Sequence, residues 1–262
     1  MPRNRFILCL LLRDNLFVNS RNFRLNPVGN LETILQYLHF EAIDELVLLN
    51  VSRNGKDIEA FARQLEMIGR YCFVPIAAGG GVRGVDDFHR LLNAGADKIV
   101  INSAVFQTPR LIPEAAKLFG SQCVVVSLDV KKNREGRYQV HALNGSWNTQ
   151  ADPVEVARRV EQGGAGEIFL TSMDRDGTCR GYDHELVRAV VEAVGIPVIA
   201  SGGVGEFQHL VDGIQLGGAA AVSAANLFHF IGQSLKKAKD FLRENGLNFP
   251  EPLWNFQRRT SL

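Results

Sequence analysis

The chain has 262 residues, 46% of them hydrophobic, and a formal net charge of +1. This composition allows a large buried core and gives no reason to expect nucleic acid or an anionic membrane as a partner. The four cysteines form no CxxC pair, which favours a reduced cytoplasmic protein, and we expect no disulfide framework, metal or cofactor. The N-terminal apolar run is only about seven residues long, too short for a membrane span, and we interpret it as a first strand.

Short β-rich runs alternate with amphipathic helical stretches along the whole chain. The predicted strands cover residues 5–12, 44–50, 74–78, 98–102, 123–129, 167–172, 197–201 and 219–224. Helical patterns lie between them at 57–71, 85–95, 109–120, 152–164 and 183–195. Eight βα units in a chain of this length favour a closed parallel barrel. We therefore predict an α/β protein with a single (β/α)8 barrel over residues 1–245, followed by a C-terminal tail at 246–262.

The second half of the chain repeats the first. Residues 75–82 (PIAAGGGV) match 197–204 (PVIASGGV), and residues 44–55 match 166–177. INSAVF (101–106) similarly matches SAANLF (223–228). Such a repeat indicates two half-barrels of four βα units each.

Glycine-rich turns follow the third and the seventh predicted strands. A turn of this kind can merely be tight, or it can bring backbone N–H groups close to a phosphate. Because two such turns are related by the repeat, we favour phosphate binding and a ligand with a phosphate at each end. The candidate ligand-binding residues are Gly80, Gly81, Asn102, Ser103, Thr171, Ser201, Gly202, Gly203, Ala225 and Asn226.

Four charged residues begin the inward-facing series of their strands, at the floor of the predicted barrel. Alternation along the strands places Arg5 with Ile7, Cys9 and Leu11, and it gives Glu45, Lys98 and Glu167 the corresponding place on three other strands. Two bases and two acids buried there must pair with one another. The pattern by itself is compatible with a structural salt-bridge cluster.

Long motifs resemble one known family. AGGGVR (78–83), GADKIVINS (95–103), FGSQCVVVSLD (119–129), GAGEIFLTSMDRDGT (164–178), IPVIASGG (196–203) and LFHF (227–230) are similar to the cyclase subunit of imidazole glycerol phosphate synthase. The resemblance covers about residues 5–230. It implies a barrel that binds a doubly phosphorylated substrate and forms a heterodimer with a glutaminase at its floor. It also implies that Arg5, Glu45, Lys98 and Glu167 form an ammonia gate, and that Asp97 faces the glutaminase.

The catalytic residues that this resemblance implies are only partly present. Asp129 matches one of the family's two acid–base aspartates, but Leu11 stands in place of the other, and leucine cannot carry a proton. Asn19 replaces a lysine of the first loop, and Asn50 replaces an aspartate after the second strand. Asp14 and Asp176 are the alternative acids, and Asp176 matches a family position that contacts substrate.

Three functions remain open. The CLLL sequence in the first strand resembles a family branch linked to lipopolysaccharide and other surface polysaccharides, in which the barrel works with a glutaminase and a sugar amidotransferase to convert an acetamido to an acetamidino group. We favour this amidotransferase-complex subunit. The alternatives are the cyclase itself, a lyase of histidine biosynthesis, and a phosphosugar isomerase of the sister barrel family.

Overall fold

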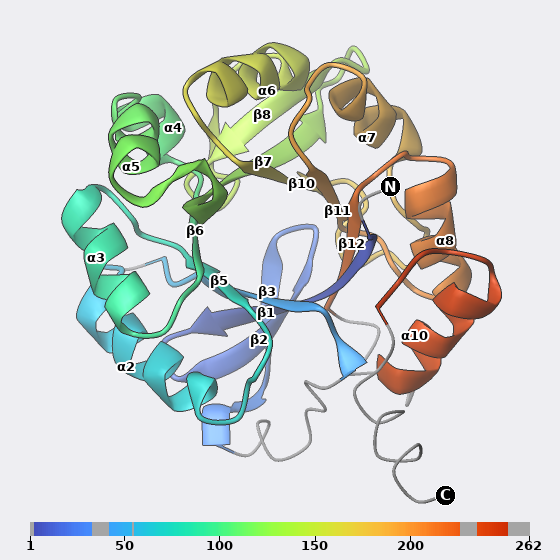
Figure 1. Cartoon of the computed structure of the whole chain (residues 1–262). Helices are drawn as coiled ribbons and strands as arrows, with labels where there is room; N and C mark the ends of the chain where they lie inside the picture. Colours follow the sequence, from blue (N-terminus) through green and yellow to red (C-terminus); the bar gives the residue numbers. More distant parts are fainter. Residues whose placement is uncertain (1–2, 33–41, 54, 226–234, 251–262) are drawn as a thin grey trace, which may run out of the picture.

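The computed structural model describes residues 3–32, 42–53, 55–225 and 235–250. Eight parallel strands form a closed barrel, because β7 pairs with both β6 and β10 while β12 pairs with β1. Figure 1 looks along the barrel and shows the helices around the outside. The barrel strands are β1 (Arg5–Arg13), β4 (Glu45–Asn50), β5 (Ile76–Gly79), β6 (Lys98–Ile101), β7 (Val124–Lys132), β10 (Glu167–Ser172), β11 (Val198–Ser201) and β12 (Ala221–Ala224). The predicted (β/α)8 barrel is confirmed.

Helices cover the outer face of the barrel. They are α2 (Ile58–Gly69), α3 (Val85–Asn93), α4 (Ala104–Gln107), α5 (Leu111–Phe119), α6 (Pro153–Gln162), α7 (His184–Val191), α8 (Phe207–Gln215) and α10 (Leu235–Glu244). The five predicted helices correspond to α2, α3, α5, α6 and α7. Asp57 and Asp152 begin α2 and α6 by accepting hydrogen bonds from N–H groups of the first turn, which satisfies donors that have no partner within the helix.

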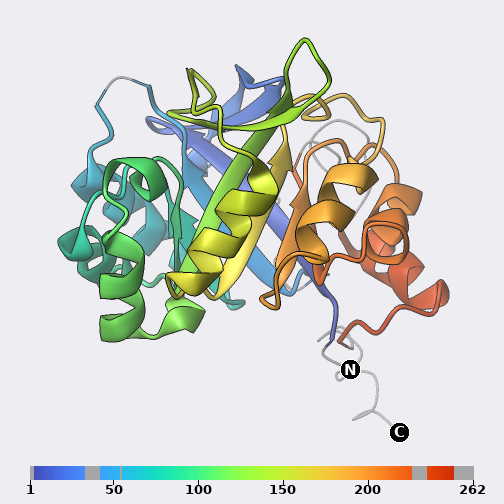
Figure 2. The ribbon, with the colours of Figure 1, turned by 90° about the horizontal axis from the view of Figure 1, so that it is seen from above.

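Two antiparallel hairpins extend the barrel and were not predicted. One joins β2 (Leu16–Arg21) to β3 (Arg24–Asn30), and the other joins β8 (Tyr138–Ala142) to β9 (Trp147–Asn148). Figure 2 shows both hairpins at the end of the barrel opposite the start of β1. This is the carboxyl end of the strands, where barrels place their active sites. Pro27 and Gly29 disfavour strand structure locally, so β3 depends on its pairing with β2.

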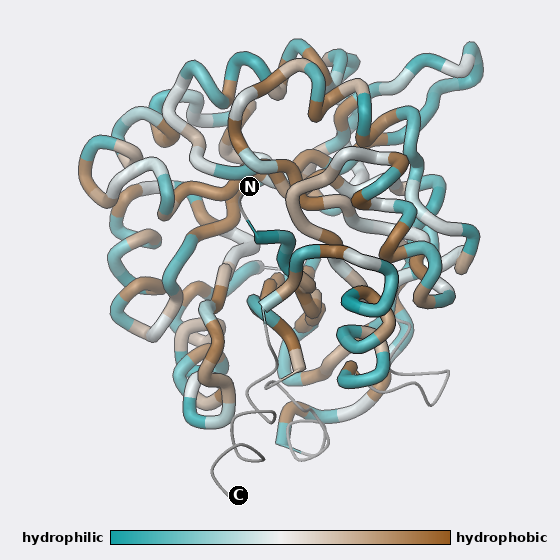
Figure 3. The backbone as a smooth tube through the Cα atoms, turned by 45° about the vertical axis from the view of Figure 1, so that its right-hand side comes forward, coloured by the Kyte–Doolittle hydropathy of each residue, from teal (hydrophilic) through white to brown (hydrophobic). Residues whose placement is uncertain are grey.

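The apolar core has two parts, one between the barrel and the helices and one inside the barrel. The outward-facing residues of β1, among them Phe6, Leu8 and Leu10, pack under the helices, whereas Ile7 and Cys9 face inward. Figure 3 shows the hydrophobic stretches along the inner strands and the mixed hydropathy of the outer helices. The interior cluster consists of Ile7, Cys9, Val47, Ala77, Val100, Val125, Phe169, Ile199 and Ala221. The predicted alternation is therefore confirmed.

The beginning of the predicted tail packs on the barrel. The backbone N–H of Asn4 donates to Asn248 O at 2.9 Å, and Phe249 is buried in the outer core. Residues 251–262 lie outside the described part of the chain. No helix among the described residues is long and apolar enough to cross a membrane.

A buried ion pair joins the last helix to the barrel. Lys239 on α10 is bound to Asp44, and the two side chains are only 3% and 8% exposed. The other carboxylate oxygen of Asp44 accepts a hydrogen bond from Phe6 N at 2.9 Å. The pair therefore connects α10 to β1 through the residue that precedes β4.

We expect Lys239→Ala to lower the free energy of unfolding by about 3–5 kcal/mol, because it leaves a buried carboxylate without its cation. Urea unfolding followed by circular dichroism measures the change. The double variant Lys239→Met with Asp44→Asn should lose much less, since neither charge remains. Equal losses in the two proteins would contradict this account.

Candidate functional site

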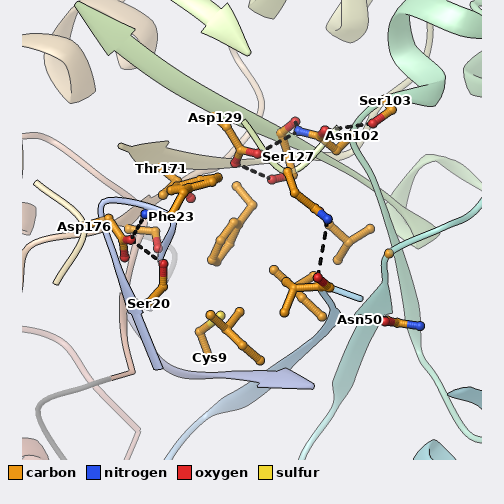
Figure 4. Close-up of a pocket in the computed structure, with 18 of the residues that line it drawn as sticks. Cys9, Ser20, Phe23, Asn50, Asn102, Ser103, Ser127, Asp129, Thr171 and Asp176 are labelled. Carbon is orange, nitrogen blue, oxygen red and sulfur yellow. Dashed lines mark hydrogen bonds between the residues drawn. The ribbon is translucent and has the colours of Figure 1, made fainter. Parts of the chain in front are cut away.

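A cavity of about 680 Å3 opens at the carboxyl end of the barrel strands. Residues of the strand ends, the following loops and both hairpin turns line it. Figure 4 shows Asn102, Ser127 and Asp129 together on one wall and Ser20, Phe23 and Asp176 on another. The cavity is of the size usual for small-molecule sites.

The first glycine turn lies where β5 ends and lines the cavity. Gly80 and Gly81 have φ angles of +105° and +93°, which side chains rarely adopt. A Cβ on Gly80 would collide with the backbone of Asn50, and one on Gly81 would lie 2.7 Å from the Cβ of Lys56. Backbone geometry and close packing thus both require glycine here.

The second glycine turn follows β11 and repeats this geometry. Gly202 and Gly203 have φ angles of +89° and +110°, and a Cβ on Gly203 would collide with the carbonyl of Gly181. Ser201 and Ala225 line the same cavity. Asn226, the remaining residue predicted for this turn, lies outside the described residues. The two turns are therefore brought to one cavity, as the repeat predicts.

Asp129 lies within β7, where neutral donors hold its side chain. The side-chain amide of Asn102 donates to Asp129 Oδ2 at 3.2 Å and to the carbonyl of Ser127 at 3.0 Å. The hydroxyl of Ser127 donates to Asp129 Oδ1 at 3.4 Å. Burial raises the pKa of Asp129 to about 7, and the charge of Asp176 adds to this shift. A carboxyl group with such a pKa can both give and take a proton near neutral pH.

Leu11 lines the cavity as an apolar residue, at the position where the family resemblance places a second aspartate. Of the two alternative acids, Asp176 lines the cavity and Asp14 does not. Asp14 is an exposed residue at the turn after β1, so the expectation that it could replace the missing acid is wrong.

Asp176 also holds the first hairpin. Its Oδ2 accepts hydrogen bonds from Ser20 Oγ at 2.5 Å and from Phe23 N at 3.0 Å. Burial raises the pKa of Asp176, and these two donors oppose the shift. Asp176 therefore joins the loop after β10 to the hairpin turn, in addition to any contact with a ligand.

Asn19 and Asn50 stand where the resemblance places charged residues, and only one of them reaches the cavity. Asn50 lines the cavity, and its Oδ1 accepts a hydrogen bond from Ser52 N at 3.0 Å. Asn19 is only 3% exposed and is absent from the cavity wall. Neither polar atom of the Asn19 side chain has a hydrogen-bond partner among the described residues, which is a costly arrangement. Asn19 therefore does not supply the contact that a lysine would make at this cavity.

Sequence reasoning missed several residues of the cavity wall. Lys56 and Arg83 come from the loops after β4 and β5, and Asn144 comes from the turn between β8 and β9. Ser223 also lines the cavity, and its buried hydroxyl has no hydrogen-bond partner in the part of the chain that the structure describes. The alternation of side chains along β12 could have predicted Ser223, because Ser223 faces inward two residues before Ala225. Lys56 and Asn144 lie in loops, where periodicity carries no information.

The four charges predicted at the barrel floor form one connected network. Arg5 donates to Glu45 at 2.6 Å and also to Glu167. Lys98 Nζ lies 2.9 Å from a carboxylate oxygen of each glutamate. Both glutamates are buried, with side chains 3% and 8% exposed. Each acid therefore contacts both bases, as burial of these groups requires.

The structure places this chain in the class of (β/α)8 barrels, in which loops at the carboxyl ends of the strands often bind phosphate. In a comparison with known families, the model of the "Histidine biosynthesis protein" family matches residues 5–232. The chain belongs to this family. The match spans all eight barrel strands and both glycine turns.

The raised pKa of Asp129 predicts a pH-dependent stability. The folded chain binds this proton more tightly than the unfolded chain, in which the pKa has its ordinary value of 3.8. The contribution of Asp129 to the free energy of unfolding therefore falls as the pH rises from this value to the pKa in the folded chain, about 7. Asp129→Asn should remove this loss. Relative to the native chain, the variant should therefore gain up to about 4 kcal/mol between pH 4 and pH 8.

Urea unfolding of both proteins at several pH values measures the difference. Asp176→Asn should reduce the effect without abolishing it, because Asp176 is a smaller cause of the shift than burial. A stability difference between the native chain and Asp129→Asn that does not change with pH would contradict the assignment.

Proposed function

We propose that the chain is the barrel subunit of a glutamine amidotransferase complex. It receives ammonia from a glutaminase at its floor and releases it at the cavity. It does not catalyse the cyclase reaction, because one residue of the acid–base pair is missing. The observation that carries this proposal is the contrast between the two ends of the barrel. The charged network at the floor is complete, whereas Leu11 lines the cavity in place of a proton carrier.

The barrel interior supports passage of neutral ammonia. Between the floor and the cavity lies the apolar interior cluster, which includes Ile7, Val47 and Ala77. An ammonium ion would lose its hydration there at high cost, while neutral ammonia would not. Arg5, Glu45, Lys98 and Glu167 would form the gate. Arg5 and Lys98 are the candidate moving parts, because their side chains are 23% and 20% exposed while both glutamates are buried.

The floor also carries a surface suited to a protein partner. Phe73 is 89% exposed and Tyr71 is 53% exposed, in the loop that leads into β5 at the amino end of the strands. Large exposed apolar side chains often mark protein interfaces. The adjacent loop holds the exposed Asp97, whose carboxylate accepts a hydrogen bond from Ile76 N at 2.8 Å. We propose that this surface, defined by Tyr71, Phe73 and Asp97, binds the glutaminase.

The destination of the ammonia is proposed from the sequence of β1. Its CLLL sequence resembles the branch associated with surface-polysaccharide synthesis, including lipopolysaccharide. In this role the barrel delivers ammonia to a sugar amidotransferase that forms an acetamidino group. The cavity then binds a phosphorylated ligand that regulates delivery.

The cyclase of histidine biosynthesis is the alternative function, and one observation favours it. Asp129 has a pKa raised to about 7, and its charge interacts with that of Asp176 in the same cavity. Asp129 could therefore act as one acid–base group, with Asp176 in support. In this mechanism Asp176 must act as an acid–base group while it also accepts hydrogen bonds from Ser20 Oγ and Phe23 N.

A cyclase assay with the doubly phosphorylated family substrate and saturating free ammonia separates the two functions. Free ammonia replaces the glutaminase, so the assay reports only on the barrel. We expect no turnover from the native chain and measurable turnover from Leu11→Asp, because one positioned acid–base group contributes roughly 10²–10⁴-fold. Robust turnover by the native chain would instead make the cyclase the better assignment.

Size-exclusion chromatography with a glutaminase of the imidazole glycerol phosphate synthase type tests the partner surface. We expect a heterodimer with the native chain and at least a tenfold weaker complex with Phe73→Asp, because the substitution places a charge at an apolar contact. Leu16→Asp is the matched control, since Leu16 is 40% exposed at the opposite end of the barrel. Equal binding by native chain and Phe73→Asp would argue against this surface.

A further inference from the structure

The basic residues of the cavity gather at one end. Arg53, Lys56 and Arg83 line it, all from the loops after β4 and β5. No lysine or arginine from the half formed by β10, β11 and β12 is among the described lining residues. The two glycine turns have similar backbone geometry but different electrostatic surroundings. The two glycine turns are therefore alike in backbone conformation, but among the described lining residues basic side chains lie beside only the first of them.

Lys56 lies directly against the first glycine turn. Its Cβ occupies the space that a side chain on Gly81 would need. Nζ donates to the neutral amide oxygen Asn144 Oδ1 at 3.2 Å, and no salt bridge of Lys56 is present in the described part of the chain. An ammonium group has three donors, so this single contact leaves donors for a ligand. Burial lowers the pKa of Lys56, against the favourable charge of Asp129, as expected for a cation without a close anion.

The turn between β8 and β9 connects Lys56 to the rest of this site. Asn144 accepts from Lys56, while the neighbouring Leu143 N donates to Ser103 Oγ at 3.0 Å. Ser103, like Asn102, is one of the predicted ligand-binding residues. A bound anion could therefore take the place of the turn at both Lys56 and Ser103. Trp147 follows directly on this turn and contacts Phe106 edge-on, with ring centroids 5.9 Å apart.

We propose that Lys56 and Arg83 make the first glycine turn the tighter of two phosphate subsites, selective for the dianion of a phosphate monoester. The second turn binds its phosphate through backbone N–H groups and the hydroxyls of Ser201 and Ser223 only. A ligand with a phosphate at each end then binds in one orientation, with the end that carries more charge at Lys56. This inference rests on phosphate binding in the proposed function and adds two specificity-determining residues.

Titration with inorganic phosphate and with glycerol phosphate tests the inference. Isothermal calorimetry gives the affinities, and Trp147 fluorescence in a Trp254→Phe background reports on the first turn, since the chain has two tryptophans. We expect Lys56→Met to weaken the tighter site about tenfold, the effect of one lost charge-assisted hydrogen bond. Arg83→Met should weaken the same site, and Lys56→Arg should retain most of the affinity.

Two control variants test whether the loss of affinity is specific to the first glycine turn. Ser201→Ala should weaken only the second site, and Lys131→Met, which removes an exposed charge outside the cavity, should change neither. Undiminished binding in both Lys56→Met and Arg83→Met overturns the inference but leaves the proposed function standing. A native chain that binds neither phosphate compound overturns the inference together with the ligand part of the proposed function.

Discussion

Closure of the eight-stranded barrel is the constraint on which the other features depend. Once β12 pairs with β1 and β10 with β7, every second residue of each strand must point into one shared interior. This sorting makes the charged floor, the apolar middle and the polar rim into stacked layers. It also brings Asp129, Asn102 and Thr171 from separate strands to the same cavity.

The two ends of the barrel interior differ in how their charged groups are compensated. At the floor, two acids and two bases are nearly fully paired, so the burial of charge is compensated within the network. At the rim, among the described residues, Asp129 receives hydrogen bonds only from neutral groups, and Lys56 Nζ donates only to a neutral amide oxygen. Buried charges without a partner ion favour their neutral forms, and a ligand can supply what is missing. This difference is the basis on which we propose a gate at the floor and ligand binding at the rim.

The proposed function connects these two ends. Leu11 removes a proton carrier from the rim but leaves the floor network and the apolar interior unchanged. In the proposed function, a barrel with this combination would still transmit neutral ammonia, although Leu11 stands where the family resemblance places the second acid. In the proposed arrangement, Lys56 and Arg83 at one glycine turn would give a bound phosphorylated ligand a fixed orientation.

The sequence by itself determined the inward layers and the four residues of the floor, because these follow from a local period of two along each strand. The barrel and its half-barrel repeat followed from the eight βα units and from the matching segments of the two halves. Only the tertiary structure showed that the hairpin turns line the cavity, that Lys56 lies against Gly81, and that Asp14 is not among the residues that line the cavity. These facts depend on contacts between distant loops, such as Asp176 with Ser20 and Lys56 with Asn144, which no local pattern specifies. The raised pKa of Asp129 was likewise undetermined, because it arises from burial and from the charge of Asp176, and both exist only in the folded chain.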